Sequence, residues 1–188
     1  GMGGMGKTQI ALHLCYAVKN DSQKYNNCSV IWIPALSMES FEQACRAIVD
    51  SWTIKNGLVD PKEAFKAFFT SPEAGNWFLV IDNADDISVL NGSGDQSSGV
   101  AHFIPDSDSG RVLFTTRSRE VAVQVAQEHV IELSQMSSAD AMLLLQGSLI
   151  EKAQLNDDEI VHELLQELTF LPLAISQAIA YANTNQIS

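Results

Sequence analysis

The first eight residues, GMGGMGKT (1–8), decide the fold of this chain, because they match two phosphate-binding patterns at once. The dinucleotide-binding pattern G-x-G-x-x-G is met by Gly1, Gly3 and Gly6. The P-loop pattern G-x-x-x-x-G-K-[ST] is met by Gly1, Gly6, Lys7 and Thr8. Both patterns end in a helix. They differ in the acidic residue that each requires further along the chain.

Composition excludes several classes of function. The chain has 188 residues, 46% of them hydrophobic, which allows one large domain or one domain with part of another. A net charge of −12 disfavours a nucleic-acid partner. No apolar run is long enough for a membrane span, no signal peptide opens the chain, and three scattered cysteines suit a reducing compartment. We expect a cytoplasmic protein with no membrane span.

The order of apolar patterns predicts the fold class. Short β-rich runs predict strands at 29–35, 77–81, 111–116 and 130–133. Apolar residues at helical spacing predict helices at 8–18, 38–52 and 120–127, and another that begins at Pro61. The glycine- and serine-rich segment 91–99 is expected to be a mobile loop. Strands that alternate with helices predict an α/β fold, the three-layer parallel sheet of P-loop NTPases.

After residue 136 the pattern predicts helices alone. One begins near Ser137, one covers 157–168, and one restarts at Pro172. The second carries Ile160, Val161, Leu164, Leu165 and Leu168 on one stripe. We therefore predict a nucleotide-binding domain at 1–135 and a helical subdomain at 136–188. A P-loop follows a buried strand and nothing precedes Gly1, so we expect the N-terminus to be a cut through a longer protein.

The dinucleotide pattern lacks its acidic partner. An acid should end the second strand, roughly 20 residues beyond the glycines, to bind the ribose hydroxyls. That strand ends at Pro34 and Ala35, and Asp21 comes before it. The P-loop is favoured instead. Its backbone N–H groups would wrap the β-phosphate, Lys7 would reach the β- and γ-phosphate oxygens, and the Thr8 hydroxyl would bind Mg²⁺.

A P-loop also needs an acid at the end of a buried strand, and Asp82 supplies it after 77–81. We expect Asp82 to hold Mg²⁺, directly or through water. The alternative is that Asp82 caps a turn with Asn83. Asp85 or Asp86 would orient an attacking water, or the two acids are only a solvated helix start. Both roles stay open.

Arg117 follows the strand predicted at 111–116, at the sheet edge where ligands bind in such folds. It is a candidate sensor of the γ-phosphate, and the alternative is a surface ion pair with Glu120. Other P-loop classes fit less well. The chain has no N-K-x-D string, no L-S-G-G-Q signature and only four arginines for the lid of a small-molecule kinase.

Four motifs in this order resemble one family. They are GMGGMGKT (1–8), LVIDNADD (79–86), FTTRS (114–118) and LPLA (171–174). Together they resemble the NB-ARC region of STAND NTPases, the switch module of plant resistance proteins, apoptotic protease activators and fungal NOD-like receptors, and the fungal group most of all. The resemblance covers nearly the whole chain.

The resemblance implies ADP or ATP as the cofactor, with Mg²⁺ on Thr8 and Asp82. It also implies a sensor region at Thr116 and Arg117, and Pro172 near the adenine. The predicted cofactor-binding residues are Gly1, Gly3, Gly4, Met5, Gly6, Lys7, Thr8, Gln9, Thr116, Arg117 and Pro172. The predicted catalytic residues are Lys7, Asp82, Asp85, Asp86 and Arg117. Such proteins rest with ADP, exchange it for ATP on a signal, self-associate through this domain and reset by slow hydrolysis.

Three departures from the family pattern limit this expectation. Phe170 replaces the glycine before LPLA, and Asn83 replaces the second acid of the plant-type pair. The winged-helix, effector and repeat domains are absent, so the chain is expected to be a partial switch. The hypotheses are a signalling switch with weak ATPase activity, a module that holds ADP structurally without turnover and, less favoured, a metabolic P-loop kinase.

Overall fold

The computed structural model describes residues 3–21, 25, 27–54, 60–92, 98–150 and 158–185. The chain divides into two compact units. We call Thr8–Ile131 the sheet unit, and Glu132–Ser188 together with Gly1–Lys7 the helical unit. The ranges 1–135 and 136–188 for the functional domains stay predictions. The segment 91–99 was predicted to be a mobile loop, and residues 93–97 of it lie outside the described residues.

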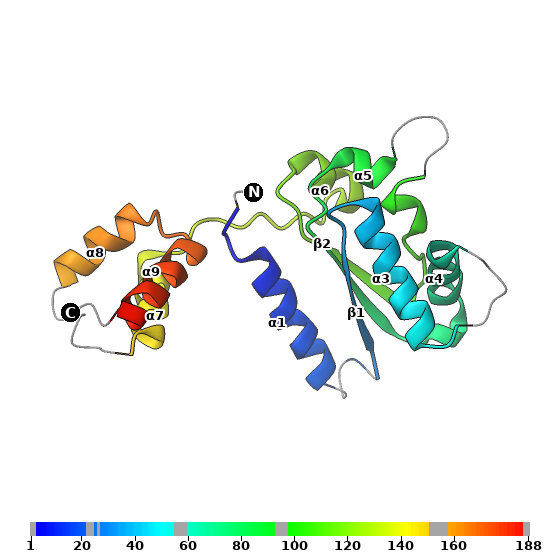
Figure 1. Cartoon of the computed structure of the whole chain (residues 1–188), viewed down its shortest axis with the longest axis horizontal. Coiled ribbons are helices and arrows are strands. Elements are labelled where there is room, and N and C mark those ends of the chain that lie inside the picture. Colours follow the sequence, from blue (N-terminus) through cyan, green and yellow to red (C-terminus); the bar gives the residue numbers. More distant parts are fainter. Residues whose placement is uncertain are drawn as a thin grey trace. The chain divides into compact units, whose positions relative to one another are not determined.

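A three-stranded parallel sheet forms the centre of the sheet unit (Figure 1). Its strands are β1 (Ser29–Pro34), β2 (Trp77–Asp82) and β3 (Gly110–Phe114), in the order β1-β2-β3. Pro34 pairs with Asp82, and Ile81 pairs with Phe114, so the carboxyl ends of all three strands meet at one edge. The central strand β2 is buried on both faces, which explains its uninterrupted apolar sequence.

Side chains that alternate along the strands build a different core on each face of the sheet. Ile33 and Ile81 face the larger core, which includes the aromatic side chains of α3 (Met38–Ser51) and α4 (Pro61–Thr70). Val80 faces the opposite way and packs on α1 (Lys7–Asn20). Figure 1 shows α1 on one side of the sheet, with α3 and α4 on the other. This arrangement confirms the predicted three-layer α/β fold.

Local sequence signals fix where the helices of the larger core begin. Ser37 and Ser40 form a reciprocal capping box at the start of α3. Asp60 caps α4, and Pro61 is its first residue, as predicted. The other described elements of this unit are η1 (Pro72–Ala74), α5 (Ile87–Asn91), η2 (Val100–Phe103) and α6 (Arg119–Ala126).

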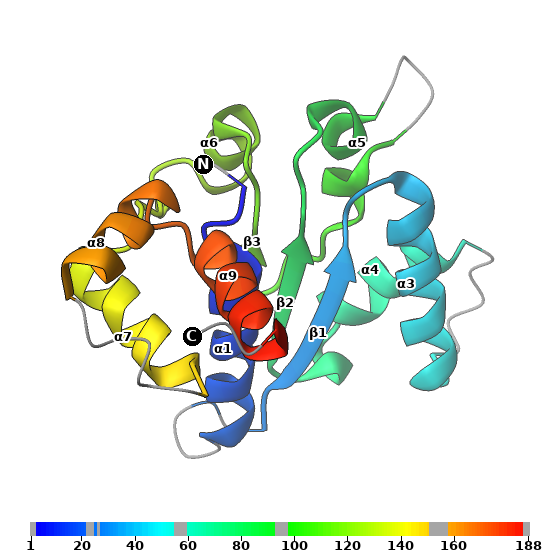
Figure 2. The ribbon, with the colours of Figure 1, turned by 60° about the vertical axis from the view of Figure 1, so that its left-hand side comes forward.

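The helical unit contains α7 (Ser138–Ser148), α8 (Asp158–Glu167) and α9 (Pro172–Asn185), labelled in Figure 2. Their shared core consists of Ala141, Leu145, Leu149, Val161, Leu165, Ile175 and Ile179. Only part of the apolar stripe of α8 is buried. Val161 and Leu165 are buried, but Ile160 and Leu164 are exposed, because the stripe that faces α7 and α9 is narrower than the apolar pattern.

The predicted strand at 130–133 is wrong. The segment has no regular secondary structure, and no described strand pairs with it. Ile131 is 83% exposed, so its apolar side chain is not held against a core. A strand requires a partner for its backbone groups, and the β-rich composition of VIEL does not supply one.

Among the described residues, no helix is long and apolar enough to cross a membrane.

Candidate nucleotide-binding site

The glycine-rich loop has the backbone conformation that its sequence requires. Gly4 has φ +77° and Gly6 has φ +85°, in the left-handed region that favours glycine. A β-carbon on Gly6 would meet nothing within 4 Å, so the space beside this backbone is open to a ligand. Met5 within the loop is buried. Gly1, another predicted site residue, lies outside the described residues.

The loop also contacts the first turn of α9 within the helical unit. The Leu173 N–H donates a 3.2 Å hydrogen bond to the Gly4 carbonyl. A β-carbon on Gly4 would lie 3.2 Å from Cβ of Leu173, so this contact leaves little room for a side chain. Pro172, the first residue of α9, precedes Leu173 directly. Two of the predicted cofactor-binding segments, the loop and Pro172, are therefore neighbours.

Helix α1 begins at Lys7, so Lys7, Thr8 and Gln9 form its first turn. The N–H groups of a first helical turn have no carbonyl partner within the helix, and the helix dipole favours an anion there. No acidic residue stands in this turn of α1. The turn therefore has the polarity that a phosphate group requires.

Asp82 lies at the carboxyl end of β2 and is the centre of the polar contacts at this edge of the sheet. Its side chain is 5% exposed. Oδ1 accepts hydrogen bonds from the hydroxyls of Thr8 at 3.1 Å and Thr115 at 2.5 Å. Oδ2 accepts from the Asn83 side-chain amide at 3.3 Å. Within the described part of the chain, this buried carboxylate forms no ion pair.

The residues around Asp82 fit a magnesium ion. Mg²⁺ prefers oxygen ligands and is usually held by one or two protein groups together with phosphate oxygens and water. Thr8 and Asp82 supply a hydroxyl and a carboxylate in direct contact. Among the described residues no cluster of three His, Cys, Asp or Glu side chains forms a metal cage, so the remaining ligands would come from phosphate and water.

Thr115 lies within the FTTRS motif (114–118) but was not among the predicted site residues. Its side chain is 6% exposed, donates to Asp82 and accepts the Asn83 N–H at 3.0 Å. The signal was present in the order of the chain: Thr115 follows β3 directly, and β3 is the neighbour of β2. Recognising it requires the strand order, which a single sequence does not give.

Asp85 and Arg117 form an ion pair between the loops that follow β2 and β3. Oδ1 of Asp85 accepts the Arg117 backbone N–H at 2.5 Å, and Oδ2 accepts Nε at 2.6 Å. The Thr116 hydroxyl donates to Oδ1 at 3.3 Å. Partial burial raises the pKa of Asp85, but the hydrogen bonds and charge of Arg117 outweigh it and hold that pKa below its ordinary value.

The remaining candidate residues, Arg117 and Asp86, contact other residues than expected. Arg117 pairs with Asp85, and no ion pair with Glu120 occurs in the part of the chain that is described. Asp86 caps α5, where its Oδ1 accepts from the N–H and the hydroxyl of Ser88 at 2.8 and 2.7 Å. These hydrogen bonds lower the pKa of Asp86. Catalytic roles for Asp85 and Asp86 stay predictions.

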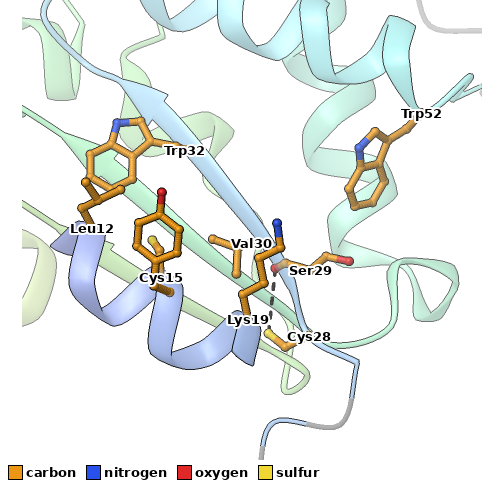
Figure 3. Close-up of a pocket in the computed structure, with 9 residues that line it drawn as sticks. Leu12, Cys15, Lys19, Cys28, Ser29, Val30, Trp32 and Trp52 are labelled. Atoms are coloured by element: carbon orange, nitrogen blue, oxygen red, sulfur yellow. Dashed lines mark hydrogen bonds between the residues drawn. The ribbon is translucent and has the colours of Figure 1, made fainter. Parts of the chain in front are cut away.

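A separate cavity of about 550 Å³ lies between α1 and β1 (Figure 3). Its lining residues are Leu12, Cys15, Tyr16, Lys19, Cys28, Ser29, Val30, Trp32 and Trp52. Ser29 and Val30 begin β1, whereas Asp82 ends the neighbouring strand, so the cavity is distinct from the polar edge. Burial raises the pKa of the Cys15 and Cys28 thiols, which keeps both protonated and weakly nucleophilic.

Comparison with known proteins agrees with this geometry. The NB-ARC domain model matches residues 1–155. A nucleotide-binding leucine-rich repeat (NLR)-like protein of Hyaloscypha variabilis is 36% identical over 197 residues, which cover 100% of this chain and 20% of that protein. The regulatory protein AfsR of Streptomyces coelicolor is 26% identical over 183 residues, which cover 93% of this chain and 17% of that protein.

The chain therefore spans about a fifth of the length of these relatives. The family match includes three of the four motifs, namely the glycine-rich loop, the segment with Asp82 and the segment 114–118, whereas LPLA (171–174) lies beyond it. Together with the relative that covers the whole chain, this match confirms the resemblance. The fold and the family agree, and the chain belongs to the NB-ARC domain family of nucleotide-binding P-loop modules.

Proposed function

We propose that this chain is the ADP/ATP-operated switch of a NOD-like signalling receptor. The observation that carries the proposal is the contact between Thr8, at the start of α1, and the buried Asp82 at the end of β2. The two residues come from the two motifs that a Mg²⁺–nucleotide complex requires, and the fold brings them together. The name of the Hyaloscypha relative, an NLR-like protein, supports the receptor context.

Each polar group has a stated task in this proposal. The N–H groups of residues 3–8 hold the β-phosphate, and Lys7 neutralises the β- and γ-phosphate oxygens. Thr8 and Asp82 would hold the Mg²⁺ ion, which would supply positive charge to neutralise the phosphates. The hydrogen bond from Thr115 would hold the Asp82 carboxylate in place as a metal ligand. Pro172, beside the loop-bound Leu173, is proposed to pack near the adenine.

A switch also requires two states with different nucleotide affinities. Moving the population from 1:99 to 99:1 needs a difference of about 5.5 kcal/mol in binding free energy between the two states. Contacts to a γ-phosphate from Lys7, Asp82 and Arg117 would supply part of that difference. We propose that ATP-bound chains self-associate through this domain in the cytoplasm and that slow hydrolysis restores the ADP state.

A second candidate is a module that binds ADP structurally and does not turn ATP over. The observation that favours it is that both candidate catalytic bases, Asp85 and Asp86, already have hydrogen-bond partners in the structure. Asp85 is engaged by Arg117, Asp86 caps α5, and Asn83 stands where plant-type relatives have a second acid. At 100 times its dissociation constant, a bound ligand adds about 2.7 kcal/mol of stability, which would be the benefit of holding ADP.

Nucleotide affinity and turnover in the full-length protein test both candidates. We expect Lys7→Ala to weaken ADP and ATP binding, and Asp82→Ala to abolish Mg²⁺-dependent turnover. Lys19→Ala is the matched control, because Lys19 is an exposed lysine near the other end of the same helix. It should bind both nucleotides like the unmodified protein.

The outcomes separate the candidates. If Lys7→Ala binds ADP as tightly as the unmodified protein, the P-loop assignment is wrong. If turnover is undetectable in both the unmodified protein and Asp82→Ala, the ATPase is refuted and the structural ADP module stands. Phosphate transfer to a small molecule in a substrate screen would instead support a metabolic kinase.

A further inference from the structure

Asp85 binds two atoms of the same arginine, and this restricts that side chain. One carboxylate oxygen accepts the backbone N–H of Arg117 while the other accepts its Nε. The Asp85 carboxylate thus bridges the backbone and the side chain of Arg117. This bridge restricts where the Arg117 guanidinium can point.

Hydrogen bonds join the loop that follows β2, which carries Asp85, to the loop that follows β3, which carries Arg117. The Asn83 N–H donates to the Thr115 hydroxyl, and the Ala84 N–H donates to the Thr115 carbonyl at 2.9 Å. Thr115 in turn contacts Asp82. Arg117 is thus two residues from a direct contact of the proposed Mg²⁺ ligand, within about 7 Å of chain. Arg117 therefore follows the same edge of the sheet that carries Asp82.

We propose that Asp85 is a positioning residue that holds Arg117 back, so that the γ-phosphate of ATP must displace the Asp85 carboxylate before it engages the guanidinium. ADP has no γ-phosphate and leaves the Asp85–Arg117 pair intact. The contact thereby lowers the affinity for ATP relative to ADP and determines which nucleotide the resting protein holds. This inference rests on the proposed function of the same site.

The strength of the contact suits a displaceable latch. Paired hydrogen bonds from one arginine to one carboxylate are among the stronger contacts in proteins. The Arg117 side chain is nevertheless 62% exposed, and exposed ion pairs are weakened by solvent. A phosphate group that carries more charge than a carboxylate can therefore compete for the guanidinium. The lowered pKa of Asp85 is consistent with a carboxylate that stays charged.

The test is the ratio of two dissociation constants, for ADP and for a non-hydrolysable ATP analogue, measured by calorimetry with Mg²⁺ on the full-length protein. Asp85→Asn is the informative variant. Its remaining oxygen can still accept the Arg117 backbone N–H, while its amide group cannot accept Nε. We expect the ATP analogue to bind at least about fivefold more tightly relative to ADP, the low end of allosteric coupling.

Glu120→Gln is the matched control, because Glu120 is an exposed acid three residues from Arg117 and its loss removes the same charge. It should leave the ratio unchanged, and Arg117→Ala should reduce the preference for the ATP analogue. Equal unfolding midpoints would exclude a general loss of structure.

An unchanged or lowered ATP preference in Asp85→Asn, or the same gain in Glu120→Gln, would contradict the proposed role of Asp85 while leaving the P-loop assignment in place. If Lys7→Ala weakens neither nucleotide, the proposed function itself fails, and the latch with it.

Discussion

The hydroxyl of Thr115 donates a 2.5 Å hydrogen bond to Oδ1 of Asp82, the oxygen that also accepts from Thr8 at 3.1 Å. Three elements meet at this atom: the start of α1, the end of β2 and the residue after β3. Parallel strands deliver their carboxyl ends to one edge, so a single buried carboxylate can be oriented by a neighbouring strand. The orientation of the proposed Mg²⁺ ligand therefore depends on a residue outside both P-loop motifs.

Thr115→Val tests this dependence. Valine keeps the shape but removes the donor to Asp82 and leaves the Asn83 N–H without its acceptor. We expect a loss of about 1–3 kcal/mol in unfolding free energy from the unpaired polar groups. Nucleotide affinity should fall by about tenfold in Mg²⁺ and little in EDTA, as is typical for residues that orient a metal ligand.

Titration calorimetry in the two buffers checks the Thr115 prediction, and urea unfolding checks its stability component. Thr70→Val is the control, since Thr70 is an exposed residue at the end of α4. An equal loss of affinity with and without Mg²⁺ would show that Thr115 does not act through the metal.

Gly110→Ala is expected to destabilise the sheet unit. A β-carbon at Gly110 would lie 2.1 Å from the Trp77 ring, which is itself 1% exposed and fixed by a hydrogen bond from Nε1 to the Phe69 carbonyl. Overpacking of this kind costs about 1–3 kcal/mol. Tryptophan fluorescence during urea unfolding measures the loss, because all three tryptophans lie in the sheet unit.

Gly147→Ala is the matched control for Gly110→Ala. A β-carbon there meets nothing within 4 Å, and alanine should stabilise α7 by about 0.5–1 kcal/mol because glycine is a poor helix former. Circular dichroism follows this helix. A Gly110→Ala protein as stable as the original would mean that the Trp77 ring can move aside.

The ion pairs of Lys62 predict a stability contribution that depends on pH. The ammonium contacts Glu42 at 2.9 Å and Asp60 at 3.1 Å, and it lies 5.4 Å from the Phe103 ring centroid. Hydrogen bonding to Lys62 lowers the pKa of Glu42. Partial burial raises the pKa of Asp60, but its hydrogen bonds to residue 62 outweigh this and lower it overall.

Lys62→Met should therefore cost about 1 kcal/mol or less near neutral pH, because both acids are partly exposed. A carboxyl group with a lowered pKa stabilises the fold above its ordinary value, here 4.5 for Glu42 and 3.8 for Asp60. That contribution is lost as the pH falls through the lower folded-state pKa. The raised pKa of Lys62 keeps its charge up to its ordinary value of 10.5.

Urea unfolding between pH 3 and pH 8 checks the sign of this effect. The difference between Lys62→Met and the original protein should be constant above about pH 5 and shrink toward pH 3. Arg46→Met is the control, since Arg46 is 59% exposed and contacts Glu42 alone among these acids. A difference that grows in acid would contradict the assignment.

A secondary-structure element could be predicted from the sequence where a continuous stretch of residues determines it. The apolar run 77–81 and the Pro61 helix start are local patterns, and both appear in the structure within a residue of their predicted positions. The segment 130–133 has the composition of a strand, but a strand also needs a partner, which no local pattern reports.

The same distinction applies to the site. The glycine loop, Lys7, Thr8 and Asp82 follow from motif spacing because each motif is a continuous stretch of chain. Thr115 and the Asp85–Arg117 pair depend on β3 lying beside β2, and residues 85 and 117 are 32 positions apart. A single sequence cannot rank Asp85 against Glu120 as the partner of Arg117. That choice is made by the strand order.

Asp86 offers a direct test between a cap and a catalytic base. Its Oδ1 accepts from the Ser88 N–H at the first turn of α5, and serine is as good a residue as aspartate at that helix position. Asp86→Ser should preserve both the stability and any ATP turnover, whereas Asp86→Ala should lower the unfolding midpoint. Turnover in both variants should stay within about twofold, since no transition-state contact is removed. A rate that falls steeply in Asp86→Ser with an unchanged midpoint would identify Asp86 as the base after all, because serine keeps the cap but cannot accept the proton of an attacking water.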